Sequence, residues 1–220
     1  MQPRKAKMKI LYPPRPKGKI PPATLPKYER SGQWLWQRKF NGTHVVVNVS
    51  PNREVGILTR HGTAPKLFSL SRDHVREILS LNLNPGSEYW FAGELLDHKT
   101  KNQNYKKKIV LFDVLQAGRY LMRRPDQVGR LNLLADICGR PQELEPNNGI
   151  ALQVTDKIWM AEWWDTNAVD RFKDHLTTDE IEGLVLRKKK ATLDNFGNKK
   201  YEVNWMIRCR KAHAGGNYGF

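Results

Sequence analysis

Residues 34–49 read Trp-Leu-Trp-Gln-Arg-Lys-Phe-Asn-Gly-Thr-His-Val-Val-Val-Asn-Val, so a lysine and a glycine come just before four closely spaced valines. The valines predict a strand, and a turn followed by residues 54–60 predicts its partner in a hairpin. Gly42 allows the backbone to approach a ligand closely, next to Lys39. A Lys-x-x-Gly tetrapeptide is common by chance, so its meaning depends on the elements that follow it.

Patterns of both strand and helix follow this hairpin. Apolar runs predict strands over residues 88–96, 108–115, 150–158, 181–187 and 201–210. Helical spacing of apolar residues predicts helices over residues 71–83, 126–138 and 160–176. This mixed order predicts one α+β domain over residues 31–220.

Residues 1–30 are rich in proline, lysine and arginine and show no hydrophobic periodicity. They predict an extended or partly disordered arm. Two interpretations stay open, because such an arm can simply solubilise the domain or can bind the phosphates of a polynucleotide.

The composition indicates a polyanionic partner. Lysine and arginine number 38 against 22 aspartates and glutamates, a net charge of +16, which favours nucleic acid. No run is apolar enough for a membrane span or a signal peptide, so we expect no membrane association. Two cysteines make neither a disulfide framework nor a zinc site. We therefore expect a cytoplasmic protein. Separately, we expect a monomer.

Five further motifs follow Lys39 in a fixed order. They are Thr59-Arg60-His61-Gly62, Ala92-Gly93-Glu94-Leu95, Leu111-Phe112-Asp113-Val114, Glu182-Gly183-Leu184-Val185-Leu186-Arg187 and Trp205-Met206-Ile207-Arg208-Cys209-Arg210-Lys211. Together they resemble the covalent nucleotidyltransferase superfamily, which contains ATP-dependent DNA ligases, RNA ligases and mRNA capping enzymes. The resemblance covers roughly residues 34–211. It implies an ATP-grasp-like ligase domain of antiparallel sheets flanked by helices, without the OB-fold domain that usually follows.

The resemblance also implies roles in catalysis. Lys39 matches the nucleophile that takes AMP from ATP. Glu182 matches a carboxylate that serves a divalent ion, Mg²⁺ or Mn²⁺. Arg208 and Arg210 fall near the paired lysines that grip the α-phosphate, and Lys211 is a candidate equivalent of one of them. Arg208 and Arg210 are two residues apart in a predicted strand, so their side chains project from one face.

Three further residues match positions that bind the nucleotide. Arg60 matches a residue that contacts the ribose or a substrate phosphate. Glu94 matches the carboxylate that holds a ribose hydroxyl. Phe112 matches the aromatic residue that stacks on adenine, although its apolar neighbours also fit a core position.

Several positions depart from the commonest family pattern, namely Asn41, His44, Ala92, Arg187, Arg208 and Arg210. Arginine keeps the positive charge of lysine but cannot donate a proton. The leading hypothesis is an ATP-dependent polynucleotide ligase that joins 3′-hydroxyl and 5′-phosphate ends, with DNA favoured over RNA. The alternatives are a capping-type guanylyltransferase that uses GTP, and a nucleic-acid-binding protein on a degenerate ligase scaffold.

Overall fold

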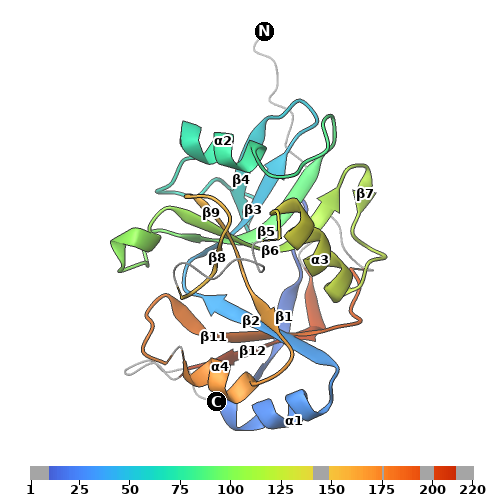
Figure 1. Ribbon diagram of the computed structural model, residues 1–220, viewed down its shortest axis with the longest axis vertical. Helices are drawn as coiled ribbons and strands as arrows, with labels where there is room; N and C mark the ends of the chain where they lie inside the picture. Colours follow the sequence, from blue (N-terminus) through green and yellow to red (C-terminus); the bar gives the residue numbers. More distant parts are fainter. Residues whose placement is uncertain (1–9, 141–148, 175, 194–200, 212–220) are drawn as a thin grey trace.

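The computed structural model describes residues 10–140, 149–174, 176–193 and 201–211. Two sheets lie one above the other, and helices flank both of them (Figure 1). Sheet A has the strand order β1-β12-β11-β2-β10. Its strands are β1 (Arg15–Ile20), β2 (Trp34–Phe40), β10 (Trp163–Trp164), β11 (Ile181–Lys188) and β12 (Glu202–Arg210).

Sheet B has the order β4-β3-β5-β6-β9-β8, and β7 pairs with β6 off this path. Its strands are β3 (Thr43–Val49), β4 (Val55–Thr59), β5 (Tyr89–Leu96), β6 (Lys108–Ala117), β7 (Tyr120–Leu121), β8 (Leu152–Gln153) and β9 (Ile158–Met160). The chain leaves β2 in one sheet and enters β3 in the other after two residues, Asn41 and Gly42. The Lys39 motif therefore lies where the two sheets meet.

The helices complete the two layers. Helices α2 (Arg72–Leu79) and α3 (Gln127–Ile137) pack on sheet B, while α1 (Leu25–Arg30) and α4 (Ala168–Lys173) pack on sheet A. Two short 3₁₀ turns, η1 (Pro22–Thr24) and η2 (Gln103–Tyr105), lie in the connections. The start of α2 follows from its sequence, because the Ser71 hydroxyl accepts a hydrogen bond from the His74 backbone N–H at 3.3 Å.

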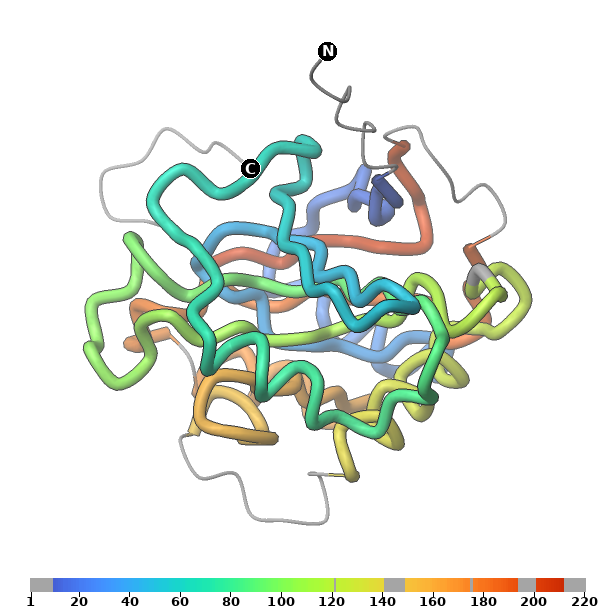
Figure 2. Tube along the Cα trace, turned by 90° about the horizontal axis from the view of Figure 1, so that it is seen from above, coloured from blue at the N-terminus to red at the C-terminus, as the bar shows by residue number. Residues whose placement is uncertain are grey.

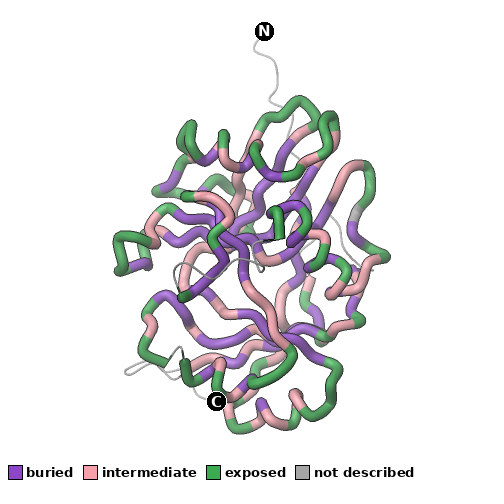
Figure 3. Tube along the Cα trace, in the orientation of Figure 1, coloured by how far each residue is buried: buried purple, intermediate pink, exposed green. Residues whose placement is uncertain are grey.

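The apolar core has three parts, and the buried residues concentrate on the strands (Figure 3). One part is formed by sheet B and the helices packed on it, and it includes Val45 and Phe91. A second lies between sheet A and its two helices and includes Trp36, which is fully buried. The third joins the sheets through Phe40 of β2 and Val110 of β6. This third part holds the two sheets together on one side of the space between them.

Most of the predicted elements are confirmed. The predicted hairpin is β3–β4, and the strands expected over residues 88–96, 108–115, 181–187 and 201–210 are β5, β6, β11 and β12. The helix expected over residues 126–138 is α3, and the one over 71–83 is the shorter α2. The predicted α+β class is confirmed, with the difference that β1 pairs with β12, and β6 with β9, in parallel.

Two expectations about single elements were wrong. The strand expected over residues 150–158 is divided into β8 and β9. The helix expected over residues 160–176 is confined to α4, because Trp163 and Trp164 form β10 instead and pair with Gln37 and Trp36 of β2. Backbone pairing with an existing sheet thus overrides the local helical spacing.

The amino-terminal segment is extended only in part. Residues 15–20 form β1, which lies along β12 although the two strands are far apart in sequence (Figure 2). Leu25 of α1 is 1% exposed and belongs to the core of sheet A. From Arg15 onward this segment is therefore part of the domain, while residues 1–9 of the expected arm lie outside the described residues. No helix in the described ranges is both long and apolar enough to cross a membrane.

Candidate active site between the two sheets

A cavity of about 660 Å³ opens between sheets A and B. Seven of the eight predicted site residues line it although they come from six separate stretches of the chain. They are Lys39, Arg60, Glu94, Phe112, Glu182, Arg208 and Arg210. The fold therefore brings motifs that are far apart in the sequence together on one concave surface.

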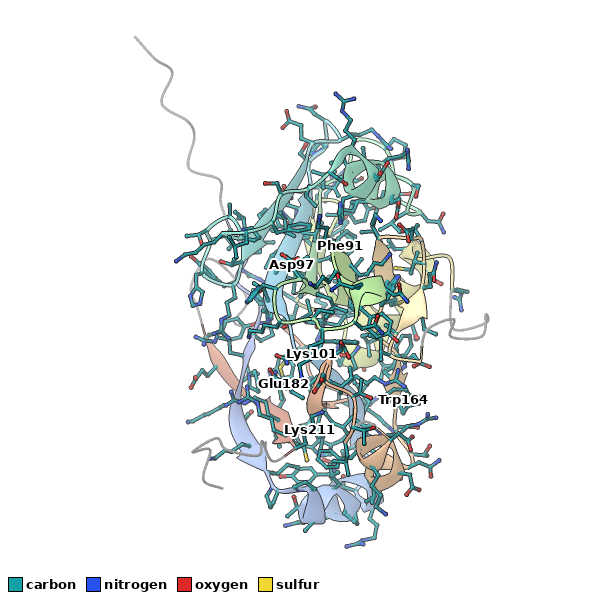
Figure 4. All side chains as sticks on the ribbon, turned by 90° about the vertical axis from the view of Figure 1, so that its left-hand side faces the viewer. Phe91, Asp97, Lys101, Trp164, Glu182 and Lys211 are labelled. Atoms are coloured by element: carbon teal, nitrogen blue, oxygen red, sulfur yellow. The ribbon has the colours of Figure 1, made fainter. Side chains whose placement is uncertain are left out.

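Lys39 and Glu182 form the closest contact in this cavity. Lys39 Nζ donates a hydrogen bond to Glu182 Oε2 at 2.5 Å, and Arg210 Nε lies 3.4 Å from the same oxygen. The arrangement follows from strand register, since Gly183 of β11 pairs with Lys39 of β2 on one side and with Arg210 of β12 on the other. Figure 4 shows Glu182 in the middle of the molecule, between Phe91 of sheet B and Lys211.

Gly183 makes this close packing of three strands possible. Its φ is +135°, and a Cβ atom at this position would lie 2.1 Å from the backbone oxygen of Cys209. Only glycine fits there without moving β12. The glycine of the Glu-Gly pair therefore has a structural reason, because it holds Arg210 beside Glu182.

The charge state of Glu182 follows from its neighbours. Burial alone would raise the pKa of this carboxyl group, but the charge of Lys39, the hydrogen bond from Lys39 and the charge of Arg210 act in the opposite direction. The net effect is a pKa below the ordinary value. Glu182 is thus a carboxylate at neutral pH, available to a cation.

Glu94 lies on the opposite wall, in β5. Its Oε1 accepts a hydrogen bond from the Gly42 backbone N–H at 3.1 Å. Burial raises the pKa of Glu94 to about 7; the charge of Lys39 opposes this rise and that of Glu182 adds to it. A Cβ atom on Gly42 would lie 2.4 Å from the Leu95 backbone oxygen, so glycine is also required here.

Phe112 presents its ring to the cavity next to two basic side chains. The His44 ring meets it edge-on at a centroid distance of 5.3 Å, and the Arg187 guanidinium carbon lies 5.2 Å from the ring centre. Burial, and after it the positive charges of Arg60 and Arg187, lower the pKa of His44 to about 3. The imidazole is therefore neutral at pH 7.

A buried acidic group to which the motifs assigned no role holds this wall in place. Asp113, 1% exposed, accepts hydrogen bonds from Arg187 Nη1 at 2.8 Å and from Arg130 Nε at 3.0 Å. Arg130 lies in α3 and is fully buried. The acidic residue directly after Phe112 was a signal for this network, but nothing in the sequence indicates that a helical arginine is its partner.

The Lys211 side chain lies apart from the cavity residues, although its backbone N–H donates a hydrogen bond to the Glu182 backbone oxygen at 2.9 Å. It does not line the cavity, and its Nζ donates hydrogen bonds to the backbone oxygens of Thr178 at 2.5 Å and of Leu176 at 3.3 Å. These contacts fix the segment that precedes β11. The expectation that Lys211 replaces one of the phosphate-binding lysines is not supported by this placement.

The carboxylates of Glu94 and Glu182 fit a divalent ion only if a bound ligand, such as a phosphate group, supplies further oxygen atoms. The described ranges contain no cluster of three or more histidine, cysteine, aspartate or glutamate side chains that could hold a metal. Mg²⁺ is commonly bound by one or two carboxylates together with phosphate oxygens. Glu182 in the cavity fits such a shared site.

Comparison with known proteins supports the fold. No family model matches the chain, and no curated protein matches its sequence. Among solved structures, a mycobacterial DNA ligase D complexed with ATP and MES matches with a TM-score of 0.58 and 14% identity, over 91% of this chain and 60% of that chain. The ligase domain of M. tuberculosis LigD matches with a TM-score of 0.58 and 14% identity, over 90% of this chain and 58% of that one.

A third solved structure also matches in fold at low sequence identity. The ATP-dependent DNA ligase of bacteriophage T7, in complex with ATP, gives a TM-score of 0.51 and 12% identity, over 88% of this chain and 67% of that chain. The chain thus spans about 60% of the length of the ligase D structure. Identities this low show the fold, which is that of the catalytic part of ATP-dependent DNA ligases, and the expected ligase-type α+β fold is confirmed.

Proposed function

Because the chain has this fold and places a lysine against a carboxylate and an arginine in its central cavity, we propose that it is an ATP-dependent polynucleotide ligase. The observation that carries the proposal is the position of Lys39, whose Nζ lies inside the cavity at 2.5 Å from Glu182. A lysine that served only solubility would point into solvent, and in this chain the fold encloses it.

The first step is the transfer of AMP to the enzyme. Lys39 Nζ attacks the α-phosphorus of ATP, a P–N bond forms, and the bond from that phosphorus to the oxygen of the leaving pyrophosphate breaks. Nζ reacts only as the neutral amine, so its ammonium proton passes to the solvent before the attack. Arg210, beside Glu182, neutralises charge that develops on the α-phosphate.

The walls of the cavity position the nucleotide. Phe112 offers a ring face to the adenine, and Glu94, near its pKa at pH 7, can accept or donate a hydrogen bond to a ribose hydroxyl. Glu182 would hold a divalent ion together with the phosphates, and such an ion would supply positive charge at the transferring group. Arginine at positions 208 and 210 retains the charge of the lysines it replaces, so phosphate binding is preserved.

Two further steps complete the joining reaction. The AMP group moves from Lys39 to a terminal 5′-phosphate, which forms a P–O–P bond as the P–N bond breaks. A 3′-hydroxyl then attacks the activated 5′-phosphorus, and AMP leaves as the strand is sealed. The net charge of +16 favours a polynucleotide as the partner in both steps.

The test of the first step is labelling with ATP that carries ³²P in its α-phosphate, in the presence of Mg²⁺. We expect label on the denatured protein that mild acid removes and alkali does not, as for a P–N bond. Lys39→Arg keeps the pairing with Glu182 and should abolish the label. Lys66→Arg, at an exposed lysine outside the cavity, is the matched control and should label normally.

Two further arms separate this proposal from the alternatives. Labelling from GTP and not from ATP would indicate a capping-type guanylyltransferase. The absence of label from both nucleotides would overturn the proposed enzymatic function. Salt-sensitive polynucleotide binding that Lys39→Ala leaves unchanged would then support a nucleic-acid-binding protein. For the substrate strand, we expect nicked DNA duplexes to be sealed faster than nicked RNA duplexes.

A further inference from the structure

Three arginines at one end of the cavity have no acidic partner among the residues that the structure describes. Arg15 comes from β1, Arg60 from the end of the β3–β4 hairpin and Arg208 from β12, and all three line the cavity. None of them forms an ion pair within the described part of the chain. Arg210, on the same strand as Arg208, shares the Glu182 carboxylate with Lys39.

The three charges lie close enough to act on the same groups. The pKa of Arg208 is lowered by burial first and then by Arg210, and Arg15 and Arg60 add to the effect; of the nearby residues only Glu202, which is exposed, opposes it. Arg15 and Arg60 also help to lower the pKa of His44. Like charges held together cost free energy, and a bound anion offsets that cost.

Arg15 and Arg60 are positioned by hydrogen bonds to residues outside this group of three arginines. The Arg15 backbone N–H donates to the Tyr201 oxygen at 3.1 Å, which fixes the start of β1 against β12. The Arg60 Nε–H donates to His61 Nε2 at 3.3 Å, and its backbone N–H donates to the His44 oxygen at 3.1 Å. Arg208 Nε is buried and has no hydrogen-bond partner among the described residues. The cluster therefore exists before any ligand arrives, with at least one donor unused.

The cluster is displaced from the atom that attacks ATP. Arg210 pairs with Gly183, which pairs with Lys39, whereas Arg208 pairs with Val185. Arg208 is two residues farther along β12, a separation of about 7 Å. An anion between Arg15, Arg60 and Arg208 therefore lies beside the α-phosphate position and does not coincide with it.

We propose that Arg15, together with Arg60 and Arg208, forms the site that binds the terminal 5′-phosphate of the acceptor strand. The proposal rests on the proposed ligase function, and its new element is Arg15 in the amino-terminal strand. Guanidinium groups bind phosphate oxygens in a bidentate manner, and three of them match a dianionic terminal phosphate better than a monoanionic internal one. The β- and γ-phosphates of ATP have similar chemistry, so the experiment has to separate the two sources.

The experiment compares Arg15→Ala, Arg15→Lys and Lys17→Ala. Lys17 lies in the same strand, is exposed and does not line the cavity, so its replacement removes an equal charge from outside the site. Three quantities are measured for each protein: labelling from ATP, single-turnover transfer of AMP from labelled enzyme to nicked DNA, and binding of nicked duplexes that carry either a 5′-phosphate or a 5′-hydroxyl.

We expect Arg15→Ala to slow AMP transfer about tenfold to a hundredfold more than it slows labelling, as for the loss of a charge-assisted hydrogen bond. It should also remove the preference for the 5′-phosphate duplex, Arg15→Lys should restore part of it, and Lys17→Ala should keep it. Equal behaviour of Arg15→Ala and Lys17→Ala would overturn the proposal. So would an equal loss of labelling and transfer with a raised KM for ATP, which would assign the site to the nucleotide.

The binding measurement needs no catalysis and so separates the two proposals. Should the wild-type protein fail to label, the ligase function fails, while an Arg15-dependent preference for the 5′-phosphate duplex still supports the anion site. Equal binding of the two duplexes by the wild-type protein would overturn the site, whatever the labelling shows.

Discussion

Lys39 Nζ and Glu182 Oε2 lie 2.5 Å apart although 143 residues separate them in the chain. The two side chains meet because β2 and β11 are adjacent antiparallel strands whose register aligns Lys39 with Gly183. The carboxylate keeps the lysine in place, and the pair is only partly exposed, at 19% for Lys39 and 15% for Glu182. Both groups must find new partners when a triphosphate and its cation enter.

Replacement of Glu182 by glutamine removes the negative charge at this contact and nearly keeps the shape of the side chain. We expect labelling of Lys39 from ATP to fall about a hundredfold. The glutamine amide can accept a hydrogen bond, but it lacks the negative charge that holds a cation at the phosphates. Glu180→Gln is the control, since Glu180 is buried nearby but binds the Asn102 backbone N–H and does not line the cavity. Equal rates for the two variants would exclude a role for the Glu182 charge.

A Gly42→Ala substitution should damage the site through packing alone. The added Cβ would lie 2.4 Å from the Leu95 backbone oxygen and 2.8 Å from Glu94 Cγ, so β3 or β5 has to move. We expect a loss of about 1–3 kcal/mol in the free energy of unfolding, measured by urea denaturation. Gly18→Ala is the control, because its Cβ would meet Ile207 at an ordinary 3.7 Å, and comparable losses in both variants would contradict the explanation.

The sequence predicted the motif residues of the site better than it predicted the edges of the fold. Short-range patterns were sufficient for β3, β5, β6 and β11, because each is an apolar run next to a turn. The pairing of β1 with β12 was not predictable, since Arg15 to Ile20 contains proline, glycine and three cations and has no strand pattern of its own. Such a sequence is acceptable at a sheet edge, where only one side needs hydrogen bonds.

The supporting contacts of the site escaped prediction for a related reason. Phe112 and Arg187 were recognised from their motifs, whereas the partners of Asp113 depend on how α3 packs against sheet B. Likewise, Lys211 continues a recognised motif, but β12 ends at Arg210 and the side chain turns to the carbonyl oxygens before β11. A motif thus indicates chemistry at its strand positions and says little about the residues beyond the strand end.

Replacement of Asp113 by asparagine should be among the most destabilising single changes. It would leave Arg130 and Arg187 buried with their shared counter-charge removed, and the loss of one partner of a buried ion pair costs about 3–5 kcal/mol. The control is Asp165→Asn, which breaks an exposed pair with Lys189 and should cost less than about 1 kcal/mol. Similar urea midpoints for the two variants would contradict this account.

The raised pKa of Glu94 predicts how stability depends on pH. Its ordinary value is 4.5 and its value in the folded protein is about 7, with burial as the largest cause. The folded state therefore holds this proton more tightly than the unfolded chain does. The contribution of the protonated group to stability is complete below pH 4.5, declines as the pH rises and is lost above pH 7, a difference of about 3 kcal/mol.

Glu94→Gln should remove this dependence, because glutamine keeps an oxygen that can accept the Gly42 N–H but does not ionise. Relative to wild type, we expect the variant to gain about 3 kcal/mol in its free energy of unfolding between pH 4.5 and pH 8, measured by urea denaturation at each pH. Glu54→Gln, at an exposed glutamate beside the β3–β4 turn, should leave the wild-type profile unchanged. A Glu94→Gln profile parallel to wild type would show that the Glu94 carboxyl group is solvated, and that the cavity wall opposite Lys39 is more open than its contacts indicate.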